Sequence, residues 1–260
     1  MKKGVLLSVV TLAAGLAGAV LRWMERETGF EEGTGLALPG NGPAIVLVAL
    51  TCLLAVFLIV VSVKIKYEPY FWYDKASLTQ SALCFGAYCA AALLMAGVGG
   101  IFAWKALSGD AVSLSRLILG AFAVGTATAL LLTAKGNYKE REKGRYRFRL
   151  LVPPFFCCYW LILAYERRAA NPTVLQYVYE LFAIICALLA FYYIAGFDFG
   201  RARLRRGLFF GQMAGFFSIV TLADGHAAES VLLYAAVTLY LLVYLGALLG
   251  QMERTSLLTP

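Results

Sequence analysis

The stretch PAIVLVALTCLLAVFLIVVSV, from Pro43 to Val63, decides the fold class. It contains no charged residue, and as a helix it is long enough to cross the roughly 30 Å hydrocarbon core of a bilayer. The whole chain has the same character, since 61% of its 260 residues are hydrophobic, only 15% are charged, and the mean hydropathy is +0.76. Ordinary soluble domains contain about 45–50% apolar residues. These values exclude a secreted disulfide scaffold, a disordered chain and a soluble α/β enzyme.

We therefore predict an all-α fold: a polytopic transmembrane helical bundle that forms one integral membrane domain over residues 1–260. The apolar runs on either side of 43–63 are continuous rather than alternating, which favours helices over a β-barrel. We expect about eight spans, at 4–21, 43–63, 80–104, 112–134, 150–165, 174–196, 207–223 and 230–251.

The first run has a second interpretation. Lys2 and Lys3 precede it and Ala17-Gly18-Ala19 ends it, a pattern that also resembles a signal peptide. Its apolar stretch of about 18 residues is longer than the 7–15 that such signals usually have. We expect a retained helix, and cleavage would leave seven spans.

The Lys and Arg residues predict the orientation. With eight spans, 17 of the 23 fall on the side of the termini and six on the other side. Cytoplasmic loops carry the excess of Lys and Arg, so we predict that both termini are inside, in the cytoplasmic membrane of a bacterial cell. We expect the basic loops, 135–149 above all, to meet anionic lipid headgroups rather than nucleic acid, with a specific phosphate site on that loop as the alternative. Residues 22–42 are interpreted as a solvated acidic loop on the outer side.

Sequence motifs give no catalytic, cofactor-binding or metal-binding residues. The chain has no G-x-G-x-x-G, P-loop or H-E-x-x-H pattern and a single histidine, His226. Asp224, His226 and Glu229 are close in sequence, and we interpret them as helix caps and solvated side chains. A metal site is the weaker alternative.

Four polar residues within the apolar runs form a candidate intramembrane polar site: Glu180, Arg116, Gln176 and Gln212. Ionisable groups at membrane depth are costly and often functional. Glu180 and Arg116 have opposite charge and a similar expected depth, so we predict that they form an ion pair inside the bundle. A substrate or proton site, or snorkelling of these side chains to the headgroups, are the alternatives.

Glycines repeat every four residues near the end of the chain, at Gly207, Gly211 and Gly215 and again at Gly246 and Gly250. Small residues at this spacing let a second helix approach closely. We expect these positions to pack helices within the bundle, and a homo-oligomer or a partner membrane subunit is the alternative use.

Three classes of function are compatible with the sequence. We favour a non-enzymatic membrane partner, in assembly, anchoring or sensing, because such a protein needs only packing faces and short loops. A transporter or channel for a small solute or ion is the alternative, with a polar site near Glu180 and Arg116. An intramembrane enzyme is the least supported class, since the sequence shows no nucleophile–base set or paired acids at one depth.

Overall fold

The computed structural model describes residues 2–31, 34–65, 81–108, 113–138, 147–169, 173–199, 201 and 203–256. In this part of the chain eight helices are long and apolar enough to cross a membrane, which confirms the predicted fold class of a multi-pass helical membrane protein. The helices are α1 (Lys2–Thr28), α2 (Gly42–Lys64), α3 (Ala82–Leu107), α4 (Leu114–Tyr138), α5 (Val152–Arg168), α6 (Val178–Asp198), α7 (Leu204–Val220) and α8 (Ala228–Ser256). The short 3-10 turns are η1 (Arg147–Leu151), η2 (Val174–Gln176) and η3 (Thr221–Asp224).

Local sequence explains where several helices begin. Asn41 caps α2, since its side-chain Oδ1 accepts a hydrogen bond from the Ala44 amide at 3.0 Å. Pro43 in α2 and Pro153 and Pro154 in α5 lie in the first turn, where a missing amide hydrogen costs nothing. These signals place the helix starts at the ends of the apolar runs.

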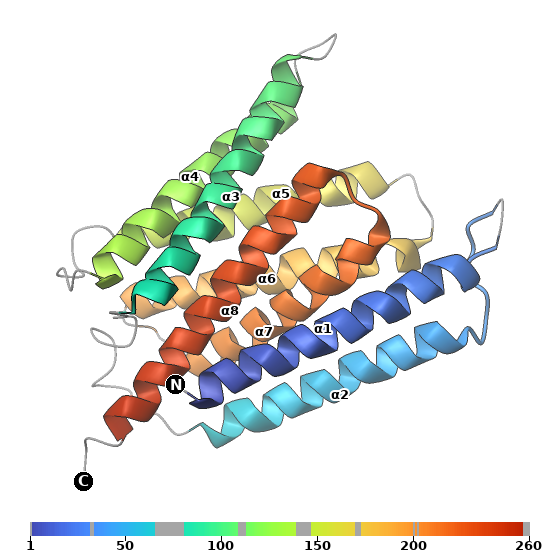
Figure 1. Ribbon diagram of the computed structural model, residues 1–260. Helices are drawn as coiled ribbons and strands as arrows, with labels where there is room; N and C mark the ends of the chain where they lie inside the picture. Colours follow the sequence, from blue (N-terminus) through green and yellow to red (C-terminus); the bar gives the residue numbers. More distant parts are fainter. Residues whose placement is uncertain are drawn as a thin grey trace.

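The helices are arranged around α7 (Figure 1). α7 packs against α1, α2, α6 and α8, and 72% of the most apolar stretch of its span is buried, whereas only 17% of the corresponding stretch of α2 is buried. The α3–α4 pair forms one edge of the bundle, where α3 packs on α8 and α4 on α5, and the α1–α2 pair forms the other edge. The strongly apolar α2 therefore presents most of its surface to lipid.

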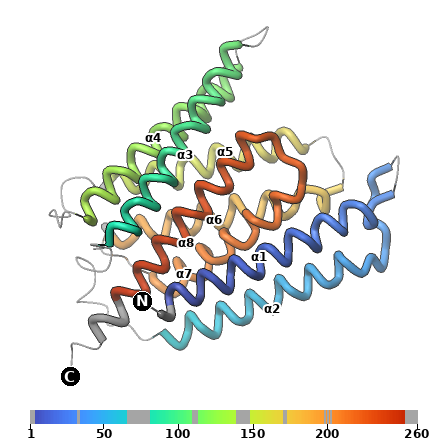
Figure 2. The backbone as a smooth tube through the Cα atoms, viewed as in Figure 1, coloured from blue at the N-terminus to red at the C-terminus, as the bar shows by residue number. Residues whose placement is uncertain are grey.

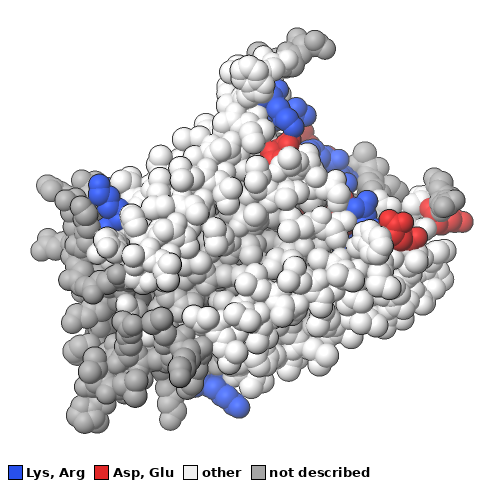
Figure 3. Space-filling model, viewed as in Figure 1, with Lys and Arg blue, Asp and Glu red and all other residues white. Residues whose placement is uncertain are grey.

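Both termini lie on one side of the bundle, called here the terminus side (Figure 2). The other, the Arg22 side, holds the end of α1 and the beginning of α8. Over the face in Figure 3, charged side chains gather toward the ends and leave an uncharged band between them. The assignment of the terminus side to the cytoplasm stays a prediction, and much of the basic 135–149 loop is outside the described residues.

The interior is filled by large side chains. The largest fully buried apolar and aromatic residues include Phe156, Trp160, Phe191, Phe216, Tyr234 and Tyr240. Glycines bring neighbouring backbones together at the edges of this core. A Cβ atom on Gly99 of α3 would lie 2.8 Å from the carbonyl oxygen of Gly120 of α4, so these two helices depend on glycine for their close approach.

A candidate functional site of buried charges

The residues predicted as an acidic loop begin as helix. α1 continues from Leu21 to Thr28, and Arg22 and Glu25 lie on one face of it at i and i+3. Hydropathy alone predicts that the first helix ends before Arg22, the first charged residue after the apolar run. The helix continues because these charges find partners elsewhere in the bundle, so this part of the loop prediction is wrong.

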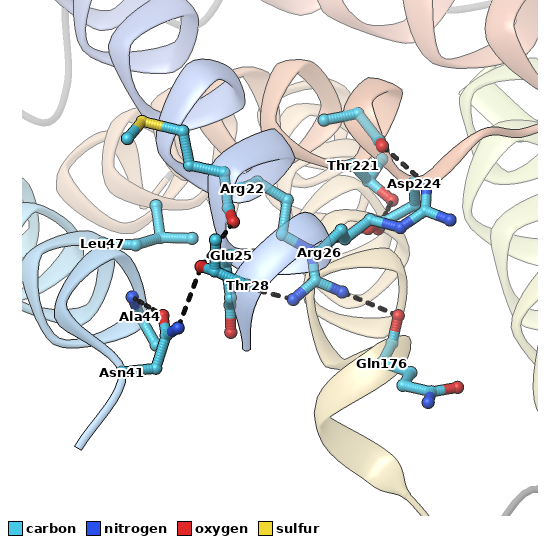
Figure 4. Close-up of polar contacts among 12 residues, drawn as sticks. Arg22, Glu25, Arg26, Thr28, Asn41, Ala44, Leu47, Gln176, Thr221 and Asp224 are labelled. Carbon is cyan, nitrogen blue, oxygen red and sulfur yellow. Dashed lines mark hydrogen bonds and ion pairs between the residues drawn. The ribbon is translucent and has the colours of Figure 1, made fainter. Parts of the chain in front are cut away.

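Arg22 is the centre of a polar cluster on the Arg22 side (Figure 4). Its side chain is 0% exposed, and each of its three nitrogens donates a hydrogen bond. Nε reaches Asp224 Oδ1 at 2.7 Å, Nη1 reaches Glu25 Oε2 at 3.0 Å, and Nη2 reaches the carbonyl oxygen of Gln176 at 2.7 Å. The guanidinium also lies 4.9 Å from the ring centroid of Tyr179. These bonds join α1 to η2, η3 and α6.

The Asp224 carboxylate continues the network. Its Oδ2 accepts a hydrogen bond from the Thr221 hydroxyl at 2.9 Å, and the same hydroxyl oxygen lies 2.9 Å from Nε2 of His226. A hydroxyl has one hydrogen, and that of Thr221 is used in the hydrogen bond to Asp224. In the contact with His226 the protonated Nε2 is therefore the donor and the hydroxyl oxygen of Thr221 is the acceptor. Burial lowers the pKa of His226 below its ordinary value of 6.5, against the opposing effect of Glu180 and Asp224, which favour the charged ring.

This geometry does not suit Thr221 as a nucleophile. The residue is 0% exposed, its proton is directed to Asp224, and Asp224 is held by Arg22. His226 is a donor to the hydroxyl oxygen and not its base. The cluster is arranged to hold structure together rather than to attack a substrate.

Several bonds fasten the neighbouring loops to this cluster. Arg26 donates to the carbonyl oxygen of Ala223 at 2.8 Å, and the Gln176 amide donates to the carbonyl oxygen of Gly35 at 2.8 Å. The second of these ties the segment between α1 and α2 to η2. The predicted polar residue Gln176 therefore acts at the surface of the Arg22 side, outside the α6 helix.

Glu180 lies beside the same cluster but is bonded more weakly. It is in the first turn of α6 and 4% exposed. Its Oε1 accepts a hydrogen bond from the Tyr234 hydroxyl at 3.4 Å, and Nη2 of Arg168 lies 3.4 Å from its Oε2, which has no hydrogen-bond partner. Both distances are long for charge-assisted contacts. The ring of His226 is 5.3 Å from that of Tyr234, so Glu180 and Arg22 belong to one continuous polar region.

The predicted ion pair between Arg116 and Glu180 is not the one that the structure shows. The cation beside Glu180 is Arg168, at the end of α5, and Arg116 is exposed in the first turn of α4. α5 packs against both α4 and α6, and its Arg168 reaches Glu180 instead. Because α6 begins at Val178, Glu180 is also nearer the helix end than the expected span, 174–196, implied.

Gln212 is the one member of the predicted set that lies deep in a helix. It is in the middle of α7 and 0% exposed. The structure therefore does not gather the four predicted residues into one site. Gln176 and Glu180 adjoin the Arg22 cluster, Arg116 is on the surface of α4, and Gln212 is inside the bundle.

The two carboxylates of the Asp224, His226 and Glu229 group, which are close in sequence, belong to different ion pairs. Asp224 binds Arg22, whereas Glu229 pairs with Nζ of Lys105 at 2.8 Å. Within the described residues there is no group of three or more His, Cys, Asp and Glu side chains that could hold a metal ion.

The glycines of α7 and α8 lie against other helices. A Cβ on Gly211 would collide with Cδ1 of Leu245, and one on Gly215 would lie 3.0 Å from Cδ2 of Leu242, both on α8. A Cβ on Gly207 would meet Tyr193 of α6 at 3.4 Å, and one on Gly246 would lie 3.6 Å from Oγ of Ser8 on α1. Gly250 is buried in α8.

Sequence analysis missed Arg22, Thr221 and the role of Asp224. The available signal was the i, i+3, i+4 spacing of Arg22, Glu25 and Arg26, which is typical of one helix face. Asp224 is about two hundred positions away in the chain, so only the fold brings it to Arg22. Comparisons of this chain with protein-family models, with curated proteins and with solved structures found no match.

Proposed function

We propose that this multi-pass membrane protein is a non-enzymatic membrane partner, which serves in assembly, anchoring or sensing and does not move a solute. The observation that carries the proposal is the saturation of Arg22. All three of its nitrogens are bonded to the protein, and none of its side chain is exposed. Three of its five N–H groups donate to the protein, and because the side chain is fully buried the other two are not open to a passing ligand.

The position of the Arg22 network opposes the motions of a transporter. Alternating access requires one group of helices to rock against another around the site. Arg22 joins α1 to η2, η3 and α6, and removal of one partner of a buried ion pair costs about 3–5 kcal/mol. A bundle that is fastened in this way is suited to present constant surfaces to lipid and to other chains.

The apolar surfaces support the same proposal. The outward face of α2 carries Ile45, Leu53 and Ile59, each more than half exposed, and Leu83 and Leu93 of α3 are exposed as well. Such faces suit lipid, a second copy of the chain or a partner subunit. The expected location in the cytoplasmic membrane, with basic loops at anionic headgroups, is part of this proposal.

The test combines a flux assay with a mass measurement. The protein is reconstituted in liposomes that contain reporters for protons and monovalent cations, and its particle mass is measured in discs of native membrane. We expect no protein-dependent flux and a discrete particle heavier than one 28.3 kDa chain. Arg22→Met should shift that particle to lower mass, whereas Arg26→Met should not. A saturable flux that Glu180→Gln abolishes would overturn the proposal.

One observation favours the second candidate function, transport of a small solute or ion. Glu180 is buried, and its Oε2 has no hydrogen-bond partner. Arg168 beside it is 36% exposed, so the cation next to this buried carboxylate is open to solvent. The flux assay with Glu180→Gln decides between the two functions.

A further inference from the structure

Gln212 is the most isolated polar side chain of the described core. It is 0% exposed in the middle of α7, and neither its amide nitrogen nor its amide oxygen has a hydrogen-bond partner. A primary amide has two donors and an acceptor oxygen, and the backbone groups around it are already used within the helix. Buried polar groups in proteins are almost always bonded, so an amide in this position requires a partner.

The packing contacts show which part of α1 faces Gln212. A Cβ on Gly15 of α1 would touch Ile219 of α7, so these two positions lie side by side. Gln212 is seven residues before Ile219, which is almost two helical turns and returns to the same face. α1 and α7 run in the same direction through the bundle. Ser8 is seven residues before Gly15 on α1, so it lies level with Gln212 on α7.

A second route through α8 gives the same level. Oγ of Ser8 donates to the carbonyl oxygen of Leu242 at 3.2 Å, and Leu242 also touches Gly215. Leu245, one turn along α8, lies against Gly211, the neighbour of Gln212. Ser8 and Gln212 are therefore at one depth where α1, α7 and α8 meet.

Thr11 supplies a third polar group there. It is one turn from Ser8 on α1, it is 0% exposed, and its hydroxyl has no hydrogen-bond partner. It is four residues before Gly15 and so shares the face that Gly15 turns to α7. Two fully buried side chains, on neighbouring helices and within about one helical turn of each other in depth, thus have unused donors and acceptors.

We propose that Thr11 and Gln212 hold a structural water molecule at the junction of α1, α7 and α8. Water has the chemistry that these groups require, because it donates and accepts at once and is stable in a buried site with two to four polar partners. The Gln212 amide and the Thr11 hydroxyl provide those partners. This inference is independent of the proposed function, since a membrane partner and a transporter could each contain such a site.

Water-edited solid-state NMR of the whole protein in bilayers tests the site directly. We expect magnetisation to pass from water to the side-chain amide of Gln212 and to Thr11. Thr126 of α4 is the matched control, since it is also a threonine that is 0% exposed with an unpartnered hydroxyl, away from Gln212. Transfer to Gln212 and Thr11 but not to Thr126 supports the site. No transfer to Gln212, or equal transfer to all three residues, overturns it.

Melting temperatures provide a second measurement. Gln212→Met keeps the length of the side chain and removes its polar atoms. If the site is dry, this change removes an unbonded amide and should raise the Tm by about 2–4 °C. If the water is bound, the Tm should fall, and the effects of Gln212→Met and Thr11→Val should be non-additive. Thr126→Val should add simply to Gln212→Met. A higher Tm for Gln212→Met, or additivity with Thr11→Val, contradicts the proposal.

Discussion

Arg22 and Glu180 lie on the same side of the bundle and are both buried, yet the protein bonds them very differently. Arg22 has three hydrogen bonds between 2.7 and 3.0 Å, whereas Glu180 has two contacts at 3.4 Å and an oxygen without a hydrogen bond. Burial alone would rank them as equal candidates for function. The difference lies in how fully their hydrogen bonds are satisfied: Arg22 is held firmly by the protein, whereas Glu180 has an oxygen that can still accept a bond.

The largest expected effect comes from removing the hydrogen bonds and ion pairs of Arg22. Arg22→Met leaves Glu25 and Asp224 without their shared cation in a region of low dielectric, so we expect a loss of about 3–5 kcal/mol in the free energy of unfolding. Arg26→Met is the matched control, because Arg26 is one turn further along α1, is exposed, and within the described part of the chain donates to the carbonyl oxygen of Ala223.

Reversible unfolding in mixed micelles measures both variants. We expect Arg26→Met to lose less than about 1 kcal/mol, in line with an exposed contact. Asp224→Asn should also be strongly destabilising, and the double variant with Arg22→Met should lose less than the two single losses together. Similar losses for Arg22→Met and Arg26→Met would erase the distinction between the two arginines.

The contrast also explains which parts of the structure the sequence predicts. Lipid imposes long apolar runs, so the eight spans are visible in the composition alone, and 43–63 differs little from the observed Gly42–Lys64. The continuation of α1 to Thr28 is not visible, because it depends on charges that are bonded by distant residues. Hydropathy detects contact with lipid and does not detect contact between polar groups.

The candidate site was predictable only in part, for the same reason. Glu180 and Gln212 are recognisable as polar residues in apolar runs, and both are buried. Their partners follow from tertiary contacts, and the choice of Arg168 over Arg116 depends on how α5 packs between its neighbours. Arg22 follows directly on the end of the first apolar run, so hydropathy places it in a loop.

A second prediction compares two buried carboxylates by the same substitution. Glu25 is bonded to Arg22 at 3.0 Å, whereas the contacts of Glu180 with Tyr234 and Arg168, among the described residues, are 3.4 Å long. Glu25→Gln keeps an acceptor for Arg22 but removes the negative charge that pairs with the buried guanidinium, so we expect a loss of about 1.5–3 kcal/mol, the size of a hydrogen bond to a charged group. Glu180→Gln keeps an acceptor for Tyr234, and its loss should be below about 1 kcal/mol. Chemical denaturation of the two variants in parallel measures the difference, and a larger loss for Glu180→Gln would reverse our ranking.

A third prediction concerns pH, because His226 lies between the two regions. Burial lowers the pKa of His226 in the folded protein, while the unfolded chain keeps the ordinary value. Below about pH 6.5 the unfolded chain therefore binds the proton more readily than the folded protein does. The stability contributed by His226 is complete above that pH and is lost as the pH falls from there through the folded-state pKa.

The measurement is the Tm of the wild type and of His226→Gln between pH 8 and pH 5. The groups that act on the ring are the acidic Glu180 and Asp224, which favour its protonation, and the basic Arg167 and Arg168, which oppose it. Other carboxylates titrate in both proteins, so the difference between the two curves isolates His226. We expect that difference to change only below about pH 6.5, in favour of the variant. A constant difference over the whole range would show that His226 does not titrate differently on folding.

The smallest expected effect tests which arginine serves Glu180. Arg168 is 36% exposed and its contact with Glu180 is long, so solvent screens the pair and Arg168→Ala should lose less than about 1 kcal/mol. Arg116→Ala should change stability by less than about 0.5 kcal/mol, because the side chain is exposed at the start of α4.

The measurement that separates the two arginines is a double-mutant cycle, in which each arginine variant is combined with Glu180→Gln. Residues in contact couple, whereas distant ones add, and we expect Arg168 to couple with Glu180 and Arg116 to add. Coupling to Arg116 alone would restore the ion pair that the sequence suggested. Strong coupling to Arg168 would make Glu180 as firmly held as Arg22, and the contrast between the two regions would then disappear.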